Sequence, residues 1–252
     1  MVRLNELVDY ANSLLEIAQF DDYCPNGLQV EGKQEISRLA TGVTASQALI
    51  DAALAWGADA ILVHHGFFWK GEPAQLTGIK YRRLRALIRA DVGLLAYHLP
   101  LDAHPELGNN ARLAALLGLS IAGRFGGAAG RGVGMHGGFS QPLGPEAVAQ
   151  RLETVLGRRP LHIAGDKPLI QRVAWCSGGA QNYVQQAADL GVDAYITGEV
   201  SEHTVHIARE SGVHFYAAGH HATERYGAQA LGEHLARHFS LAHRFFDIHN
   251  PV

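Results

Sequence analysis

The feature of this sequence that most constrains its fold is an internal repeat at a distance of 134 residues. Residues 38–66 align without a gap to residues 172–200. Identical residues in the two copies are Arg38 and Arg172, Ala40 and Ala174, Gln47 and Gln181, Ala53 and Ala187, Gly57 and Gly191, Asp59 and Asp193, and Ala60 and Ala194. Long-period similarity of this kind predicts two structural units of common construction.

Both copies predict the same order of elements. An apolar strand is followed by a turn of small residues and by an Ala-rich helix that ends at Gly57 or Gly191, where glycine suits the C-cap. A second apolar strand begins at Asp-Ala, so each copy is a βαβ unit with parallel strands and a right-handed crossover. A further helix (about 79–90 and 202–211) and a strand (92–97 and 213–218) follow each unit. We therefore predict an α/β fold built from two repeat-related halves.

The composition changes between the halves. Residues 123–138 contain eight glycines, and residues 145–156 have the pattern of a helix with Pro145 in its first turn. We predict a first half over 1–123, a Gly-rich insert with a short helix over 124–165, and a second half over 166–252. The insert is expected to be a hairpin and a helix, separable in energy and function from the chemistry. Residues 132–137 match a dinucleotide-binding pattern, but no clear strand precedes them, so we reject that interpretation.

The overall composition excludes several classes of protein. Of the 252 residues, 47% are hydrophobic, which is enough for a packed core. The net charge of -3 argues against a dedicated nucleic-acid or membrane-surface protein. Cys24 and Cys176 cannot form a disulfide framework and are expected to be buried thiols in a reducing compartment. No apolar run is long enough for a membrane helix, and the N-terminus has the pattern of an amphipathic helix, so we expect a cytoplasmic protein.

Histidine is unusually frequent, with 15 residues, and several histidines follow predicted strands. His64 and His65 follow one strand, His98 and Asp102 follow the next, and His220 and Glu224 follow the corresponding strand of the second half. The carboxyl ends of parallel strands open onto the ligand crevice of an α/β fold, where imidazole and carboxylate groups suit divalent metals. A single histidine at such a place is usually a hydrogen-bonded core residue, but the pair and the two His-x-x-x-acid elements favour a metal site.

The spacing indicates two ions rather than one. Side chains alternate along a strand, so His64 and His65 point apart unless the chain breaks at Gly66, and each is expected to serve a different ion. His220 and Glu224 are four residues apart and share one face of a helix, which would let Glu224 bridge.

At these residues the sequence resembles the GTP cyclohydrolase 1 type 2 homologue family, the NIF-three-like or YbgI-like dinuclear metal proteins. The resemblance covers nearly the whole chain, and its motifs are residues 23–32, 41–46, 63–70, 98–105, 197–202 and 219–225. It implies two intertwined α/β halves with the metal site between them, and a ring-shaped homohexamer. It further implies that His64, His65, Asp102, His220 and Glu224 bind two divalent ions, which we expect to be zinc, iron or manganese.

Two further residues follow from the repeat rather than from the resemblance. His98 is expected to be equivalent to His220, and Glu199 aligns with His65. We expect both near the ligands, His98 facing a ligand or substrate and Glu199 as a base or hydrogen-bond partner. A structural alternative is that Glu199 caps the helix that begins near Ser201.

The resemblance implies a metal-dependent hydrolase that acts on a nucleotide or a related heterocycle, with ring opening of the GTP cyclohydrolase type. Two alternatives remain open. The first is a non-catalytic metal-binding scaffold or regulatory ring, and the second is a two-metal phosphoesterase.

Overall fold

The computed structural model describes residues 1–127 and 132–252, which form two compact units. Unit 1 comprises Met1–Leu101 and Gly227–His249, and unit 2 comprises Asp102–Tyr226 and Asn250–Val252. These units divide the chain differently from the predicted ranges, because 102–123 belongs with the second unit and 227–249 returns to the first. Part of the Gly-rich insert, residues 128–131, lies outside the described residues. Within the described ranges, no helix combines the length and hydropathy needed to span a bilayer.

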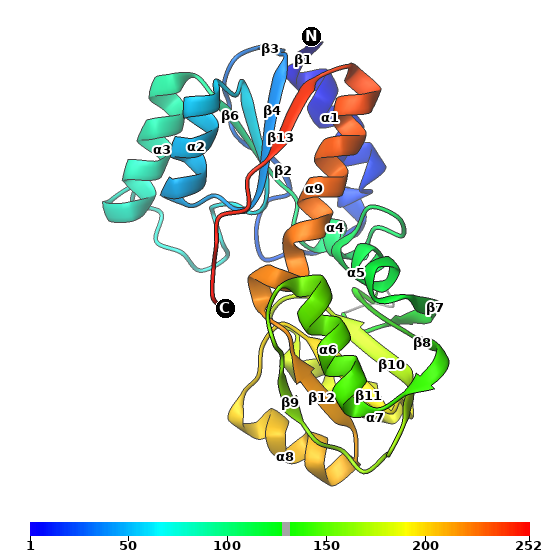
Figure 1. Ribbon diagram of the computed structural model, residues 1–252. Helices are drawn as coiled ribbons and strands as arrows, with labels where there is room; N and C mark the ends of the chain where they lie inside the picture. Colours follow the sequence, from blue (N-terminus) through cyan, green and yellow to red (C-terminus); the bar gives the residue numbers. More distant parts are fainter. Residues whose placement is uncertain (128–131) are drawn as a thin grey trace. The chain divides into compact units, whose positions relative to one another are not determined.

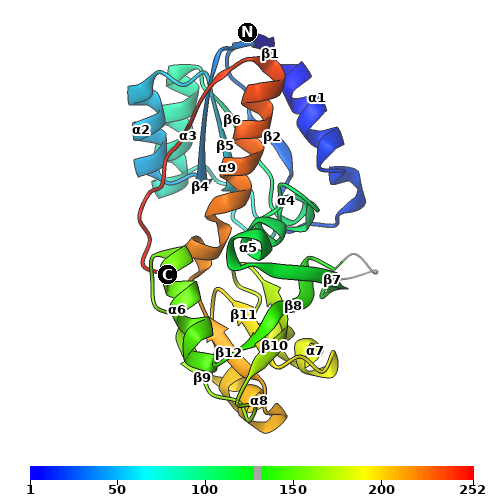
Figure 2. The ribbon, with the colours of Figure 1, turned by 45° about the vertical axis from the view of Figure 1, so that its right-hand side comes forward.

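Unit 1 contains a five-stranded sheet with helices on both faces (Figures 1 and 2). The strand order is β13-β4-β5-β6-β2, in which the first four strands are parallel and β2 is antiparallel to β6. Helices α2 and α3 cover one face, and α1 with the later part of α9 covers the other (Figure 2). A separate antiparallel pair joins β1 to β3. The strands are β1 (Val2–Arg3), β2 (Gly27–Val30), β3 (Glu35–Ile36), β4 (Arg38–Thr44), β5 (Ala60–His65), β6 (Gly93–Ala96) and β13 (Ala242–Phe245). The helices are α1 (Leu4–Leu14), η1 (Ile17–Gln19), α2 (Gln47–Trp56), α3 (Gly78–Ala90), α4 (Leu99–Ala103) and α9 (His220–Phe239). The last two residues of α4 (102–103) and the first seven of α9 (220–226) belong to unit 2.

Unit 2 contains a six-stranded mixed sheet (Figure 1). Its order is β7-β8-β10-β11-β12-β9, with β10, β11 and β12 parallel and the other three strands antiparallel to their neighbours. The strands are β7 (Leu119–Phe125), β8 (Gly134–Leu143), β9 (Leu161–Ile163), β10 (Ile170–Cys176), β11 (Ala194–Thr197) and β12 (His214–Ala217). The helices are α5 (Asn109–Leu117), α6 (Pro145–Leu156), η2 (Gln181–Tyr183), α7 (Val184–Asp189) and α8 (Glu202–Ser211).

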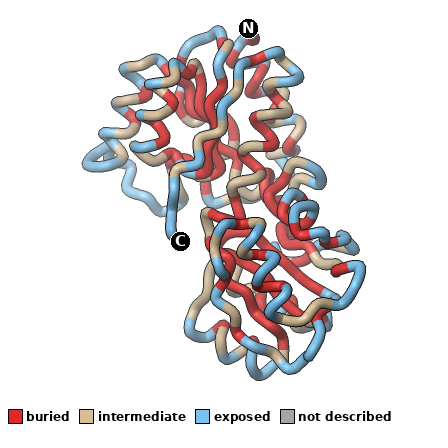
Figure 3. Tube along the Cα trace, viewed as in Figure 1, coloured by how far each residue is buried: buried red, intermediate tan, exposed pale blue. Residues whose placement is uncertain are grey.

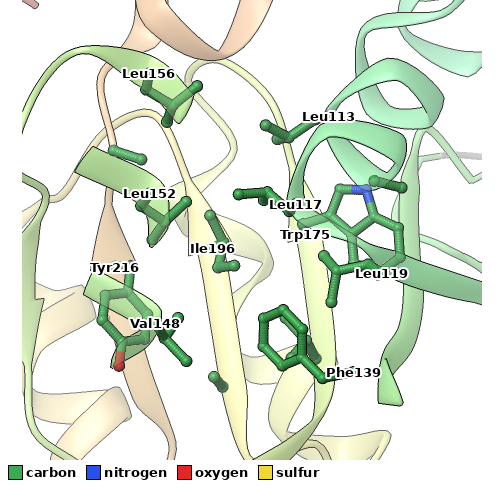
Figure 4. Packing of buried hydrophobic residues seen from close by; sticks show 14 of the residues in the cluster. Leu113, Leu117, Leu119, Phe139, Val148, Leu152, Leu156, Trp175, Ile196 and Tyr216 are labelled. Atoms are coloured by element: carbon green, nitrogen blue, oxygen red, sulfur yellow. The ribbon is translucent and has the colours of Figure 1, made fainter. Parts of the chain in front are cut away.

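The core of each unit follows from alternation along its strands. In unit 2, Ile196 of β11 packs with Trp175, Tyr216 and the apolar faces of α5 and α6 (Figure 4). The neighbouring Tyr195 points to the opposite face, where its ring meets Phe215. Figure 3 shows the central strands of each unit buried and the outer turns of the helices exposed. Burial on both faces explains why the parallel strands are continuous apolar runs.

The predicted repeat is present in the backbone. Leu39 pairs with Ala60 in unit 1, and Val173 pairs with Ala194 in unit 2, which is the same register at the same offset. The aspartate that precedes the second strand also makes the same contacts in both copies. Asp59 accepts hydrogen bonds at Oδ2 from the amides of residues 37 and 38, both at 3.0 Å. Asp193 accepts from the amides of residues 171 and 172 at 3.0 and 2.8 Å.

The insert has the predicted hairpin and helix, and both belong to unit 2. Strand β8 lies between β7 and β10, and β9 pairs with β12 at the edge of the sheet. Helix α6 contributes Val148, Leu152 and Leu156 to the core, and removing these side chains would open it. The separation of the insert from the metal chemistry stays a prediction.

Candidate metal centre

In unit 1, three imidazoles gather at the carboxyl ends of two adjacent parallel strands. His64 and His65 end β5, and His98 follows β6. The ring centroids lie 4.6 Å apart for His64 and His65, 5.1 Å for His64 and His98, and 5.8 Å for His65 and His98. One ligand nitrogen from each ring lies within 4.8 Å of the other two. The rings of His64 and His65 therefore converge although the residues are adjacent in a strand.

Each of these imidazoles is held at Nδ1. Nδ1 of His64 lies 2.9 Å from the carbonyl oxygen of Tyr97, and Nδ1 of His65 lies 3.1 Å from Oγ1 of Thr44. Nδ1 of His98 lies 2.7 Å from Oδ1 of Asp22. A carbonyl or carboxylate oxygen only accepts, so Nδ1 of His64 and of His98 carries the hydrogen when the ring is neutral. Nε2 is then the nitrogen that a metal ion would meet, as in metal sites where the other ring nitrogen is bonded to the protein.

Asp22 was missed by the sequence reasoning. Its side chain is only 3% exposed, and its Oδ2 accepts from Asn26 Nδ2 at 2.8 Å and from the amide of Leu99 at 2.9 Å. Burial raises the pKa of Asp22, but the hydrogen bond and charge of His98 and the bond from Asn26 outweigh it, so the pKa lies below its ordinary value. The residue directly precedes the motif at 23–32, and that position was the only local signal for it.

Cys24 lies close to Asp22 and His98, and one ligand atom from each comes within 4.8 Å of the others. Burial, with the charge of Asp22, raises the pKa of the Cys24 thiol to about 12. The thiol is therefore protonated at neutral pH when no metal ion is bound. Cys24 and Cys176 are both buried and form no disulfide, which confirms their predicted burial.

In unit 2, the predicted acids and His220 gather around the loop that follows β10. Asp102 is buried, and its Oδ1 accepts from Asn109 Nδ2 at 2.9 Å and from Ser177 Oγ at 3.1 Å. Ligand oxygens of Asp102 and Glu224 lie within 4.8 Å of each other. Oε2 of Glu224, also buried, lies 3.1 Å from Nε2 of His220.

His220 lies between two carboxylates. Its Nδ1 is 2.6 Å from Oε1 of Glu199, and its Nε2 faces Glu224. Burial lowers the pKa of His220, but hydrogen bonds and charge from Glu224 and then Glu199 raise it more, to about 9. A metal ion would replace the proton at Nε2, between the imidazole and the Glu224 carboxylate. The carboxylate of Glu199 therefore contacts the ring of His220, and Ser201, not Glu199, occupies the N-cap position of α8.

A glycine makes room for this pair. Gly178 has φ of +68°, and a Cβ there would lie 2.0 Å from Oε1 of Glu224 and 3.2 Å from Nε2 of His220. The next residue, Gly179, is different, because its Cβ would meet nothing closer than 3.6 Å. Only a residue without a side chain allows the backbone to approach the acid and imidazole this closely.

The predicted equivalence of His98 and His220 differs from the structure by one residue in backbone position. The amide of Tyr97 donates to the carbonyl of Val63, and the amide of Ala218 donates to the carbonyl of Thr197, the repeat-related strand residue. In backbone position His98 therefore matches Gly219 rather than His220. The chemical parallel remains, since both imidazoles meet a carboxylate through Nδ1.

The donors within each unit fit a divalent transition metal. Neutral imidazole nitrogens suit zinc, iron, nickel and copper, and carboxylates add charge compensation. Several other histidines have structural partners instead. His162 bonds His214 at 3.0 Å, His234 bonds the hydroxyl of Tyr10 at 2.8 Å, and His243 bonds Thr41 at 2.8 Å. Within the described residues, each unit thus carries several of the predicted ligands.

Comparisons with known proteins agree with this description. The family Duf34/NIF3 (NGG1p interacting factor 3) matches residues 2–251. GTP cyclohydrolase 1 type 2 homolog of Yersinia pestis is 57% identical over 248 residues, covering 98% of both chains. The homolog of the same name from Pseudomonas aeruginosa is 53% identical over 251 residues, covering 100% of this chain and 99% of the relative.

Two solved structures share the fold over the full length of both chains. One, described as protein ybgI of unknown function, has a TM-score of 0.95 and 51% identity, with 100% of each chain covered. The other, TTHA1606 from Thermus thermophilus, has a TM-score of 0.91 and 34% identity, again with 100% of each chain covered. The chain therefore belongs to the Duf34/NIF3 family.

Proposed function

We propose that this protein is a dinuclear metal-dependent hydrolase that acts on a nucleotide or a related heterocycle. His64, His65, Asp102, His220 and Glu224 would hold two divalent ions, with zinc, iron or manganese as the candidates. The observation that carries the proposal is that the imidazoles of His64 and His220 are each held at Nδ1 by an oxygen acceptor, so that Nε2 is the donor. Histidines that only stabilise a core do not need this uniform orientation.

When bound, the ions would supply Lewis-acid polarisation and lower the pKa of water toward 7, which makes hydroxide available at neutral pH. Glu199 positions His220 through the 2.6 Å bond to Nδ1 and keeps Nε2 directed at Glu224. Its side chain is 36% exposed, so the same carboxylate has access to water and could accept a proton from it.

Aromatic side chains beside the unit 1 histidines support a flat substrate. The ring of Trp69 lies 5.0 Å from that of His98 and 6.0 Å from that of His65. The ring of Tyr23 lies 6.1 Å from His98, and Tyr23 is 60% exposed. Exposed aromatic rings stack on heterocyclic bases and add about 1–3 kcal/mol per base. Such stacking would bind a nucleobase beside the ligands.

The name shared by the relatives points to ring opening of guanine. In that reaction water adds at C8, both bonds from C8 to nitrogen break, and C8 leaves as formate. Two water molecules are consumed, and the released nitrogens take up protons. The names of the relatives refer to this activity, and for this chain we propose it as the specific reaction.

The test begins with elemental analysis of the purified protein, followed by a screen of nucleotides with those metals restored. Formate release would support the cyclohydrolase reaction. Release of inorganic phosphate without formate would instead favour the phosphoesterase alternative. Absence of turnover with every metal would favour a non-catalytic metal-binding scaffold, and a protein without bound metal would overturn the proposal altogether.

The proposal includes a homohexamer, which rests on the family resemblance. Light scattering coupled to size-exclusion chromatography of the full chain measures the mass directly. A mass six times the 27.2 kDa of one chain is the expected result. A monomer at micromolar concentration would contradict it.

A further inference from the structure

We propose that Lys80 is a positioning residue that holds the ring of Trp69 where the base of a nucleotide would stack. The inference rests on the proposed function, since it requires a substrate with a heterocyclic base. It concerns the connection between β5 and α3 in unit 1, residues 66–77, and it assigns no metal ligand.

This connection is anchored at its beginning and exposed at its end. Phe67 is buried, and its amide donates to Oε1 of Gln29 at 2.7 Å. Phe68 and Trp69 are partly buried, and every residue of 70–79 is exposed. Trp69 therefore lies at the boundary between an anchored and an exposed segment, and its position depends on the contacts made on either side of it.

The backbone of Phe68 has a conformation that an aromatic residue rarely adopts. Its φ is +66°, in the left-handed region that favours glycine. Such a conformation persists only where surrounding contacts stabilise it, and it is often found beside a functional site. Phe68 packs against the core of unit 1, and Nζ of Lys80 lies 4.7 Å from the centroid of its ring. These contacts stabilise the backbone from which the next side chain, Trp69, projects.

Lys80 also holds the turn that follows Trp69. Its Nζ lies 2.9 Å from Oε2 of Glu72, and the same oxygen accepts from the amide of Trp69 at 3.2 Å. The amide of Glu72 donates to the carbonyl of Trp69 at 3.0 Å, which closes a turn with Gly71 at a φ of +89°. The hydrogen bond from Lys80 holds the pKa of Glu72 below its ordinary value, so this carboxylate is charged at neutral pH. One ammonium group thus contacts the residue before Trp69 and the carboxylate that bonds its amide.

The ring of Trp69 lies beside two of the histidines of unit 1. It is 5.0 Å from the ring of His98, at an interplanar angle of 86°, and 6.0 Å from that of His65. Among the described residues, no ring stacks parallel on the indole. A base that stacks there would therefore lie next to these histidines, where the proposed chemistry takes place.

The competing role for Lys80 is that of a solvated residue on a basic helix. Helix α3 also carries Arg82, Arg85 and Arg89, which are exposed as such a face requires. The side chain of Lys80 is only 18% exposed, and its ammonium group has both an aromatic and a carboxylate partner. A surface ion pair alone contributes little, but here the cation is shared with a ring and with a closed turn.

The first experiment compares the binding of GTP and of inorganic triphosphate, which lacks the base, to the purified full chain by isothermal titration calorimetry. Lys80→Met keeps the aliphatic stem and removes both contacts of the ammonium group. We expect its affinity for GTP to fall by at least about 5-fold, as expected for a weakened stacking contact, with unchanged affinity for triphosphate. Lys80→Arg should retain most of the affinity for GTP. Arg89→Met, on the exposed face of the same helix, is the matched control and should change neither affinity.

A double-mutant cycle tests whether Lys80 acts through Trp69. Trp69→Ala should lose at least as much affinity for GTP as Lys80→Met, and the double variant should lose no more than Trp69→Ala. Additive losses would overturn the inference, because Lys80 would then act elsewhere. Equal weakening of GTP and triphosphate binding would overturn it as well.

Hydrogen exchange gives a readout that needs no ligand. The amides of Trp69 and Glu72 are both hydrogen-bonded in the turn, so Lys80→Met should speed their exchange and Arg89→Met should not. Unchanged exchange in Lys80→Met would refute the positioning role. A wild type that binds GTP no more tightly than triphosphate would also refute the inference, while metal content and formate release would still test the proposed function separately.

Discussion

The two units use the same backbone frame but place different donors on it. At the repeat offset, His64 corresponds to Gly198, and His65 corresponds to Glu199. Unit 1 thus presents imidazoles at its strand ends, whereas unit 2 presents carboxylates and one imidazole. The strand registers and the aspartate contacts are the same in both. The common backbone therefore determines the position of each donor, and the residue at that position determines its chemistry.

A second difference concerns the loop after the first strand. Thr44 of unit 1 supplies the hydroxyl that holds His65 at 3.1 Å. Its counterpart at the repeat offset is Gly178, which has no side chain, and Glu224 and His220 fill the volume that a side chain would need. In unit 1 the residue at this position contacts one predicted ligand. In unit 2 its missing side chain leaves room for two.

The largest effect is expected when that space is removed. Gly178→Ala would place a Cβ 2.0 Å from the Glu224 carboxylate at a backbone φ of +68°. We expect the protein to lose metal that His220 and Glu224 would bind, and metal stoichiometry measures this loss. Gly179→Ala is the matched control, since its Cβ would have ordinary contacts. Equal metal loss in both variants would show that the loop, rather than this position, is responsible.

Glu224→Gln tests whether Glu224 bridges two ions. We expect both ions to bind more weakly, because an amide replaces a charged ligand that the helical spacing suggests is shared. Zinc titration with a competing chelator measures both affinities. Two ions bound with unchanged affinity would contradict the bridging assignment.

The two carboxylate–imidazole pairs allow a matched comparison. Asp22→Asn and Glu199→Gln each keep an oxygen acceptor near Nδ1 but remove its charge. Glu199→Gln should weaken metal binding by about 10–100-fold, because Glu199 orients the predicted ligand His220. Asp22→Asn should have a smaller effect, because His98 is not among the five predicted ligands. At saturating metal, Glu199→Gln should keep near-full occupancy and lose most of any hydrolytic rate. A larger loss of metal affinity in Asp22→Asn than in Glu199→Gln would contradict this order.

The smallest effect concerns stability. Burial raises the pKa of Asp59, but bonds from the amides of Ser37 and Arg38 and from Lys33 outweigh it, so the folded-state pKa lies below the ordinary value. Asp59→Asn should therefore lower the stability of unit 1 by about 1–3 kcal/mol near pH 7. Because a depressed carboxyl pKa stabilises only above the unfolded value, the difference should shrink as the pH falls below about 4.

Hydrogen exchange of the β4 amides reports this stability for unit 1 separately. The exchange of β10, the equivalent strand of unit 2, provides the internal control and should not change in Asp59→Asn. A difference between variant and wild type that grows toward acid pH would contradict the sign of the effect.

The residues of the candidate site could be predicted from the sequence where they follow strands. His64, His65 and His98 come directly after apolar runs, and parallel strands end at a common edge. Asp22 was not accessible in this way. It belongs to an irregular segment before β2, and its role depends on a hydrogen bond across 76 positions of the chain to His98. No local pattern encodes such a contact.

By itself, the sequence determined the repeated strand–helix–strand frame, because apolar periodicity and a C-capping glycine act over a few neighbouring residues. Only the tertiary structure decided that 227–249 returns to unit 1, where β13 pairs with β4. It also decided that β8 and β9 complete the sheet of unit 2. Short edge strands such as β13, with every other residue exposed, carry little apolar pattern, and their partners are selected by hydrogen bonds between distant segments.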